Sequence, residues 1–178
     1  MALFIKKIAM KLIGLTLVAF FIFLIFNMIS IRKFGMKSCL SDYGKLWGDA
    51  VPIKNMNLWS IVLAVIAFLM IPPIIQSAEG NPLQFIGFLS PVYLFLVIFT
   101  PDYKSTNKLW TIHRIGAFTC AIGMVVWMIF IMHMWIPPVV CLALFLAIGF
   151  SANNLKYAIT YYAELAVFMA TYWVLLSY

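Results

Sequence analysis

Six long runs of apolar residues, almost free of charged side chains, take up most of this chain of 178 residues. The runs cover residues 12–31, 58–75, 83–99, 115–134, 135–150 and 159–176. A helix needs roughly 20 apolar residues to cross the hydrocarbon core of a bilayer, and only helices and closed barrels satisfy every backbone group there. The pattern therefore predicts an all-α fold, a polytopic transmembrane bundle of six helices, with residues 1–178 forming a single transmembrane domain.

Composition excludes the soluble alternatives. The chain is 66% apolar and only 10% charged, whereas soluble domains are about 45–50% apolar and about 25% charged. A soluble globule of this length could not bury so much apolar surface. The run over residues 12–31 is also longer than the roughly 7–15 apolar residues of a cleaved signal peptide, so we expect it to be a retained helix.

Basic residues lie between the apolar runs, and the net charge is +7. This placement is typical of signals that set membrane topology, so we expect no nucleic-acid partner. With six spans, one side of the membrane carries nine basic residues: Arg32, Lys33, Lys37, Lys45, Lys54, Lys104, Lys108, Arg114 and Lys156. The other side carries Lys6, Lys7 and Lys11. The nine-to-three ratio favours both termini outside the cytoplasm, whereas the lysines before the first helix favour the opposite orientation.

The same span count brings most ionisable residues to one membrane face, in either orientation. Asp42 follows the first helix, Asp102 follows the third, and His113 opens the fourth. Glu164 lies about five residues into the sixth helix, counted from the same face. We therefore expect a polar pocket or ligand-binding site at this face, formed by Ser41, Asp42, Tyr43, Asp102, His113, Arg114, Tyr161 and Glu164.

Glu164 is the strongest single indication of a site. An acid in a membrane span costs about 2.5–3.5 kcal/mol on insertion scales, so it marks a functional position by default. Helical spacing predicts one polar stripe facing the bundle: Tyr157, Thr160, Tyr161, Glu164 and Thr171. We expect Glu164 to pair with His113, Arg114 or Tyr161. A structural ion pair, a ligand-binding or catalytic role and a proton-coupled role all fit this pattern.

No catalytic or metal-binding motif accompanies these residues. His113 can cap the fourth helix, or it can act as a base or metal ligand beside Asp102 and Glu164. Ser41 precedes Asp42, so a serine nucleophile is conceivable. No residue spacing in the chain is diagnostic of either chemistry, and no cofactor is indicated.

Two further expectations concern packing. Gly116, Cys120 and Gly123 share one face of the fourth helix, and small residues at such spacing let membrane helices approach closely. We expect this face to pack within the monomer rather than to form a dimer seam. Residues 32–57 are too apolar for a solvated linker, so we expect an ordered cap on the bundle or in the interface.

A resemblance adds to this interpretation. The chain has Leu40-Ser41-Asp42-Tyr43-Gly44 after the first helix, Phe99-Thr100-Pro101 at the end of the third helix, and His113 at the start of the fourth. This order resembles an uncharacterised family of bacterial six-helix membrane proteins, distantly like the DRAM-type membrane proteins. The resemblance implies a six-helix topology in a bacterial inner membrane and gives weight to Ser41, Asp42, Pro101 and His113. It implies no biochemical activity.

Three functions fit these features. The first is a non-enzymatic membrane protein that binds a membrane lipid, another amphipathic ligand, a partner membrane protein or further copies of itself. The second is an intramembrane hydrolase or transferase that uses Asp42, Asp102, His113 and Glu164. The third is a small transporter or channel subunit, which the absence of an inverted repeat disfavours.

Overall fold

The computed structural model describes residues 2–53, 56–152 and 155–178, and these residues are almost entirely helical. The helices are α1 (Ala2–Phe34), α2 (Asp42–Ala50), α3 (Leu58–Ser77), α4 (Gln84–Ile98), α5 (Asn107–Val126), α6 (Ile136–Ser151) and α7 (Leu155–Ser177). A π-helical turn, Trp127–Ile131, continues α5. The two-residue strands β1 (Pro52–Ile53) and β2 (Met56–Asn57) pair antiparallel between α2 and α3. Each predicted apolar run is thus helical, and α2 is one helix more than the sequence predicted.

Four helices are long and apolar enough to cross a membrane: Met10–Phe34, Leu58–Ser77, Asn107–Ile131 and Tyr157–Ser177. The chain is therefore an all-α membrane protein. The expected count of six full-length spans is not reached, because α4 has 15 residues and α6 has 16. At 1.5 Å per residue such helices rise about 23 Å, less than the roughly 30 Å of a typical hydrocarbon core.

Proline position explains why α6 is short. Pro137 and Pro138 occupy the first turn of α6, where their missing N–H groups cost nothing. They start this helix rather than kink it. Pro72, Pro73 and Pro91 do lie inside α3 and α4.

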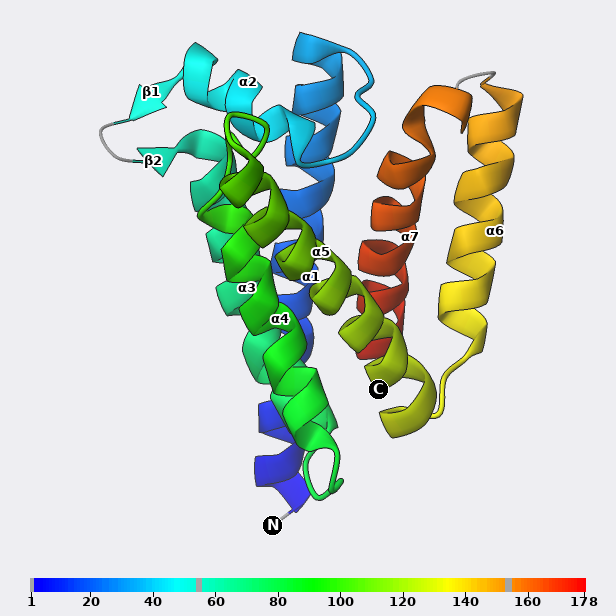
Figure 1. The fold of residues 1–178 in the computed structure, drawn as a ribbon. Coiled ribbons are helices and arrows are strands. Elements are labelled where there is room, and N and C mark those ends of the chain that lie inside the picture. Colours follow the sequence, from blue (N-terminus) through cyan, green and yellow to red (C-terminus); the bar gives the residue numbers. More distant parts are fainter. Residues whose placement is uncertain (1, 54–55, 153–154) are drawn as a thin grey trace.

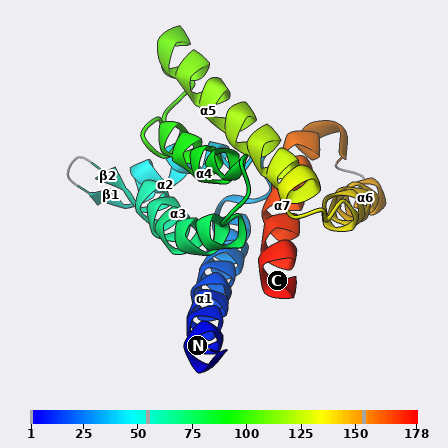
Figure 2. The same ribbon diagram turned by 90° about the horizontal axis from the view of Figure 1, so that it is seen from below.

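The apolar helices run alternately up and down (Figure 1). The C-terminal end of α1, the helix α2, the α4–α5 loop and the first turns of α7 lie at one end of the bundle, which we call the α2 end. The α3–α4 loop lies at the opposite end. Seen end-on, α6 lies beside α7 at the outer edge, away from α3 and α4 (Figure 2).

The segment after α1 is an ordered cap over its described residues, as predicted. Gly35, with φ of +72°, ends α1 in the left-handed conformation that glycine adopts without strain. The helix α2 then packs on the bundle, with Tyr43 and Trp47 buried. The Trp47 indole N–H donates to Ser30 Oγ at 2.8 Å, and Tyr43 Oη donates to the Gly35 carbonyl at 2.9 Å. These bonds fix α2 across the ends of the longer helices.

Small residues join α5 to α4 within the monomer, as expected. A Cβ atom on Gly116 would lie 2.7 Å from Leu96 Cβ and 2.9 Å from the Tyr93 carbonyl oxygen. A Cβ atom on Gly123 would lie 2.1 Å from Ser90 Oγ. Both glycines therefore allow a close approach of the two helices that no other residue permits.

We expect Gly116→Ala to lower the free energy of unfolding by about 1–3 kcal/mol, the usual cost of overpacking. The variant Gly14→Ala is the matched control, because nothing lies within 4 Å of a Cβ atom at Gly14. Thermal unfolding of the detergent-solubilised protein would measure both. Equal stabilities of the two variants would contradict the close α4–α5 contact.

The helix order also predicts a membrane topology. Lys45 on α2 and Lys108 on α5 lie near the α2 end, whereas Glu79 lies in the α3–α4 loop, and all three are exposed. In a background without the native cysteines, Lys45→Cys and Lys108→Cys should react with an impermeant maleimide from the same side of sealed vesicles. Glu79→Cys should react from the other side. Labelling of positions 45 and 108 from opposite faces would contradict the topology.

Candidate functional site

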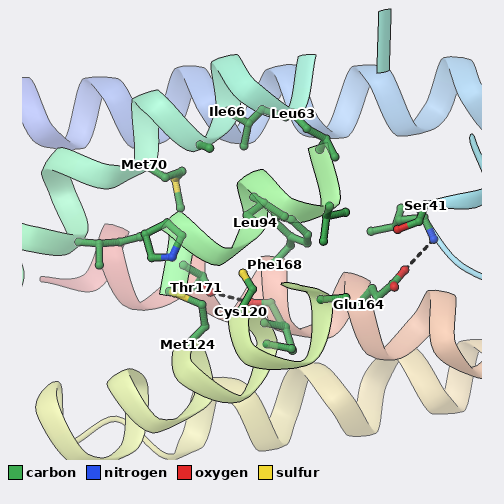
Figure 3. Close-up of a pocket in the computed structure, with 18 of the residues that line it drawn as sticks. Ser41, Leu63, Ile66, Met70, Leu94, Cys120, Met124, Glu164, Phe168 and Thr171 are labelled. Carbon is green, nitrogen blue, oxygen red and sulfur yellow. Dashed lines mark hydrogen bonds between the residues drawn. The ribbon is translucent and has the colours of Figure 1, made fainter. Parts of the chain in front are cut away.

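An elongated cavity lies among α3, α4, α5 and α7, beneath the segment that precedes α2 (Figure 3). Its empty space amounts to about 830 Å³, including the part that opens to its surroundings. Its walls are almost wholly apolar: Leu40, Trp59, Leu63, Ile66, Ala67, Met70, Ile74, Pro91, Leu94, Val97, Ala117, Cys120, Ala121, Met124, Val167 and Phe168. Ser41, Glu164 and Thr171 supply its few polar groups.

The cavity is long and has one polar end. Along α3 it reaches from Trp59 to Ile74, about 22 Å at the helical rise of 1.5 Å per residue. Figure 3 shows Ser41 and Glu164 together at one end and Met70, Met124 and Thr171 toward the other. The Thr171 hydroxyl donates a hydrogen bond to the Val167 carbonyl of its own helix at 2.8 Å. Its oxygen can still accept a hydrogen bond, but the other two polar residues of the lining, Ser41 and Glu164, lie together at the opposite end.

Glu164 is held there by the backbone of the segment before α2. The Leu40 N–H donates to Glu164 Oε2 at 2.6 Å. Among the residues that the structure describes, the Ser41 hydroxyl has no hydrogen-bond partner, although Ser41 is only 5% exposed. The polar end thus presents a carboxyl group with one oxygen engaged and a hydroxyl group that is free.

A break in α7 creates this arrangement. Ala158 has φ of −128° and ψ of 23°, which is not helical. The N–H of Tyr161 is therefore available to the neighbouring segment, and it donates to the Ser38 carbonyl at 3.0 Å. Two hydrogen bonds, one on each side of Cys39, thus join the segment over residues 35–41 to the first turns of α7.

The prediction that Glu164 pairs with His113, Arg114 or Tyr161 was wrong. The prediction that Glu164 faces the bundle was right. His113 Nδ1 lies 2.9 Å from Thr100 Oγ1. The guanidinium of Arg114 stacks on Trp110 at 4.2 Å and is exposed. Tyr161 Oη donates to Asn27 Oδ1 at 3.4 Å. The actual partner is a backbone group, which the pattern of side chains along the sequence does not show.

The expected polar stripe on α7 is also only partly correct. Tyr161 and Thr171 are buried and Glu164 is partly buried, but Tyr157 and Thr160 are exposed. The non-helical backbone at Ala158 changes the direction of the first turn. The helical spacing that predicts the stripe therefore does not apply to the residues before Tyr161.

Asp42 is the centre of a second polar cluster at the same end of the bundle. Its carboxylate accepts hydrogen bonds from Ser38 Oγ at 2.5 Å, Tyr103 Oη at 2.9 Å and Lys104 Nζ at 2.5 Å. Cys39 Sγ lies 3.3 Å from Tyr103 Oη. These contacts fasten the start of α2 to the α4–α5 loop, so we call Asp42, Ser38, Tyr103 and Lys104 the Asp42 cluster.

Burial and hydrogen bonding shift the pKa values of the ionisable groups in this region in opposite directions. Burial alone would raise the pKa of the Asp42 carboxyl, but the hydrogen bonds from Lys104, Ser38 and Tyr103 outweigh it and lower the pKa. Burial, reinforced by the negative charge of Glu164, raises the pKa of the Cys39 thiol to about 11. Burial also raises the pKa of Tyr103. Asp42 is thus ionised at neutral pH, whereas Cys39 is a protonated thiol and not a nucleophile.

His113 belongs to the back of this cluster. Its ring stacks on Tyr103, with centroids 4.0 Å apart and planes at 14°. Thr100 gives its only hydroxyl proton to the Leu96 carbonyl at 2.6 Å, so Thr100 Oγ1 must accept from His113 Nδ1–H. His113 therefore holds Tyr103 and the end of α4 in place, and it does not line the cavity.

The residues predicted for one site therefore fall into three places. Ser41 and Glu164 line the cavity. Asp42 is the centre of the Asp42 cluster, and His113 packs against Tyr103 of that cluster. Asp102 lies 3.8 Å from Lys45 at the exposed rim. Tyr43, Tyr161 and Arg114 line no part of the cavity. Over the described part of the chain, no three His, Cys, Asp or Glu side chains are placed to hold a metal ion. None of the described hydrogen bonds and ion pairs joins Asp42, Asp102, His113 and Glu164 directly to one another.

Several residues of the site were missed from the sequence. The apolar walls carry no motif, and Lys104 was counted only as a topology signal. Tyr103, Cys39 and Thr100 could have been noted because they flank Asp102, Leu40 and Pro101 in the two polar loops. Their contacts depend on how those loops meet in space.

Comparison with known proteins adds nothing to these observations, since no protein-family model, curated protein or solved structure matches the chain.

The Asp42 cluster predicts an acid-sensitive cap. Because the folded pKa of Asp42 lies below its unfolded value of about 3.9, the stabilisation is complete above that value and is lost as pH falls through the folded pKa. We expect Asp42→Asn to lower the free energy of unfolding by about 1–2 kcal/mol at pH 7. This is the contribution of a charged hydrogen bond, reduced because Lys104 is exposed to solvent. Asp49→Asn, at an exposed position of α2, should change little. Thermal unfolding from pH 7 to pH 3 checks this, and equal acid sensitivity of wild type and Asp42→Asn would contradict it.

Proposed function

We propose that this chain is a small integral protein of a bacterial inner membrane that binds a membrane amphiphile. The acyl chain of the ligand lies in the cavity among α3, α4, α5 and α7, and its polar head lies at the end formed by Ser41 and Glu164. In this proposal all six apolar helices cross the bilayer, with α4 and α6 accommodated by local thinning of the bilayer.

The observation that carries the proposal is the combination of an apolar cavity with a single polar end. The cavity length of about 22 Å exceeds the roughly 15 Å that half of a 30 Å hydrocarbon core provides. An extended acyl chain therefore fits along it. Walls of Leu, Ile, Met and Phe side chains offer contacts to a hydrocarbon chain and nothing that would orient a polar solute.

The positions of α5 and α7 support entry from the bilayer. The two helices diverge toward the α2 end (Figure 1), and the cavity walls include Ala117 and Ala121 of α5 and Val167 and Phe168 of α7. We infer that a lipid chain enters sideways between these two walls, without passing through water.

Photo-crosslinking in nanodiscs tests the proposal. A lipid with a diazirine in its acyl chain should label peptides of α3, α4, α5 and α7 that line the cavity. Ala121→Phe, which places a ring in the cavity, should reduce this labelling about tenfold, since overpacking costs about 1–3 kcal/mol. The control Ala143→Phe lies on the exposed side of α6 and should leave labelling unchanged. Equal labelling of both variants would refute the proposal.

A further inference from the structure

We propose that the cavity selects amphiphiles whose head group donates hydrogen bonds, an amine or a hydroxyl, and rejects anionic heads such as carboxylate. This inference rests on the proposed function, because it names the class of ligand that the same cavity takes.

The acyl chain cannot supply the selectivity. Lipid tails are as apolar as leucine side chains, so a chain gains little hydrophobic free energy when it leaves the bilayer for a protein cavity. Chains of equal length would all fit the same walls. The choice among ligands therefore falls to the polar end.

Glu164 makes that end an acceptor. A protonated amine beside the Glu164 carboxyl group favours its ionised form, which offers acceptor positions on both oxygens and no donor. The Leu40 N–H takes one position on Oε2, and the described residues supply no other hydrogen bond to this carboxyl group. A head group with an N–H or O–H bond satisfies the remaining oxygen, whereas an anionic head would bring a second set of acceptors.

Charge at this end favours the same choice. The ion pairs among the described residues join Lys104 to Asp42 and Lys45 to Asp102, and neither cation reaches Glu164. Lys104 balances Asp42, so among the residues that the structure describes no cation pairs with the carboxyl of Glu164. A buried carboxylate without a partner is costly, and a protonated amine would supply the missing cation.

Ser41 completes the recognition. Its hydroxyl lines the cavity next to Glu164 and has no partner in the described part of the chain. A hydroxyl both donates and accepts one hydrogen bond or more. An amine head can therefore donate to Glu164 and to Ser41 at once, and a hydroxyl head can donate to Glu164 while it accepts from Ser41.

The experiment uses three photo-crosslinkable probes with the same acyl chain and different heads: a primary amine, an alcohol and a carboxylic acid. Each is added to the full-length protein in nanodiscs at pH 7, and cavity labelling is measured by peptide mass spectrometry. In the wild type we expect the amine and the alcohol to label about tenfold more than the acid, the ratio that one charged hydrogen bond of about 1.4 kcal/mol produces.

Glu164→Gln is the matched variant. The glutamine keeps an oxygen for the Leu40 N–H, so the fold is retained, but it replaces the second acceptor with an NH₂ donor. The preference for the amine should fall to near unity or reverse in favour of the acid. Ser41→Ala should reduce labelling by the alcohol severalfold and leave the melting temperature unchanged.

The outcomes separate this inference from the function on which it rests. If no probe labels the cavity, or if Ala121→Phe does not reduce labelling, the proposed function fails. If all three probes label and Ala121→Phe blocks them, but the acid labels as well as the amine, only the head-group inference fails. An amine preference that persists unchanged in Glu164→Gln would also overturn it.

Discussion

The contact between residues 35–41 and α7 is the interaction on which the rest of the functional end depends. It consists of two hydrogen bonds that backbone N–H groups donate, from Tyr161 N–H to the Ser38 carbonyl and from Leu40 N–H to the Glu164 carboxyl. Within a membrane protein a buried N–H without an acceptor costs about 1–3 kcal/mol, so Glu164 stabilises the segment while the segment orients Glu164. The same contact closes one end of the cavity and brings Asp42 to the α4–α5 loop.

Local pattern was sufficient to predict the helices, because each apolar run must satisfy its own backbone in lipid. All six runs are helical over most of their length, although residues 132–135 are not, and the tight packing at Gly116 and Gly123 follows from the absence of side chains there. The pattern was less informative about where each helix ends and how regular it is. It did not show that the run over residues 115–134 stops being helical after Ile131, or that the helical period of α5 widens into a π-helical turn at Trp127–Ile131. It predicted an ordered cap over residues 32–57 but not that α2 is a helix.

The site was harder to predict, because a span count places a residue at one end of a bundle but not around its circumference. Asp42, Asp102, His113 and Glu164 do lie at one end, as the count requires. Their directions are set by features that the count ignores: the break at Ala158, the hydroxyl bond from Thr100 to Leu96, and the stacking of His113 on Tyr103. Glu164, the acid that lies within a predicted span, was correctly identified as part of the site, because a carboxyl group is costly in lipid. Its partner was a backbone N–H, and no side-chain pattern marks such a group.

The helix α5 shows why a cavity lies beside one of the closest helix contacts in the protein. Gly116 and Gly123 bring one face of α5 against α4, and this contact fixes the direction of the whole helix. Beside that face, the short side chains of Ala117 and Ala121 line the cavity together with Val167 and Phe168 of α7. The space left between them is lined by apolar groups, so it offers water almost no hydrogen-bond partners. If it were empty, its walls would lose dispersion contacts with nothing in return. In a bilayer the material at hand to fill such a space is an acyl chain, and the small residues of α5 then serve two purposes, close packing on one face and room for a ligand on the next.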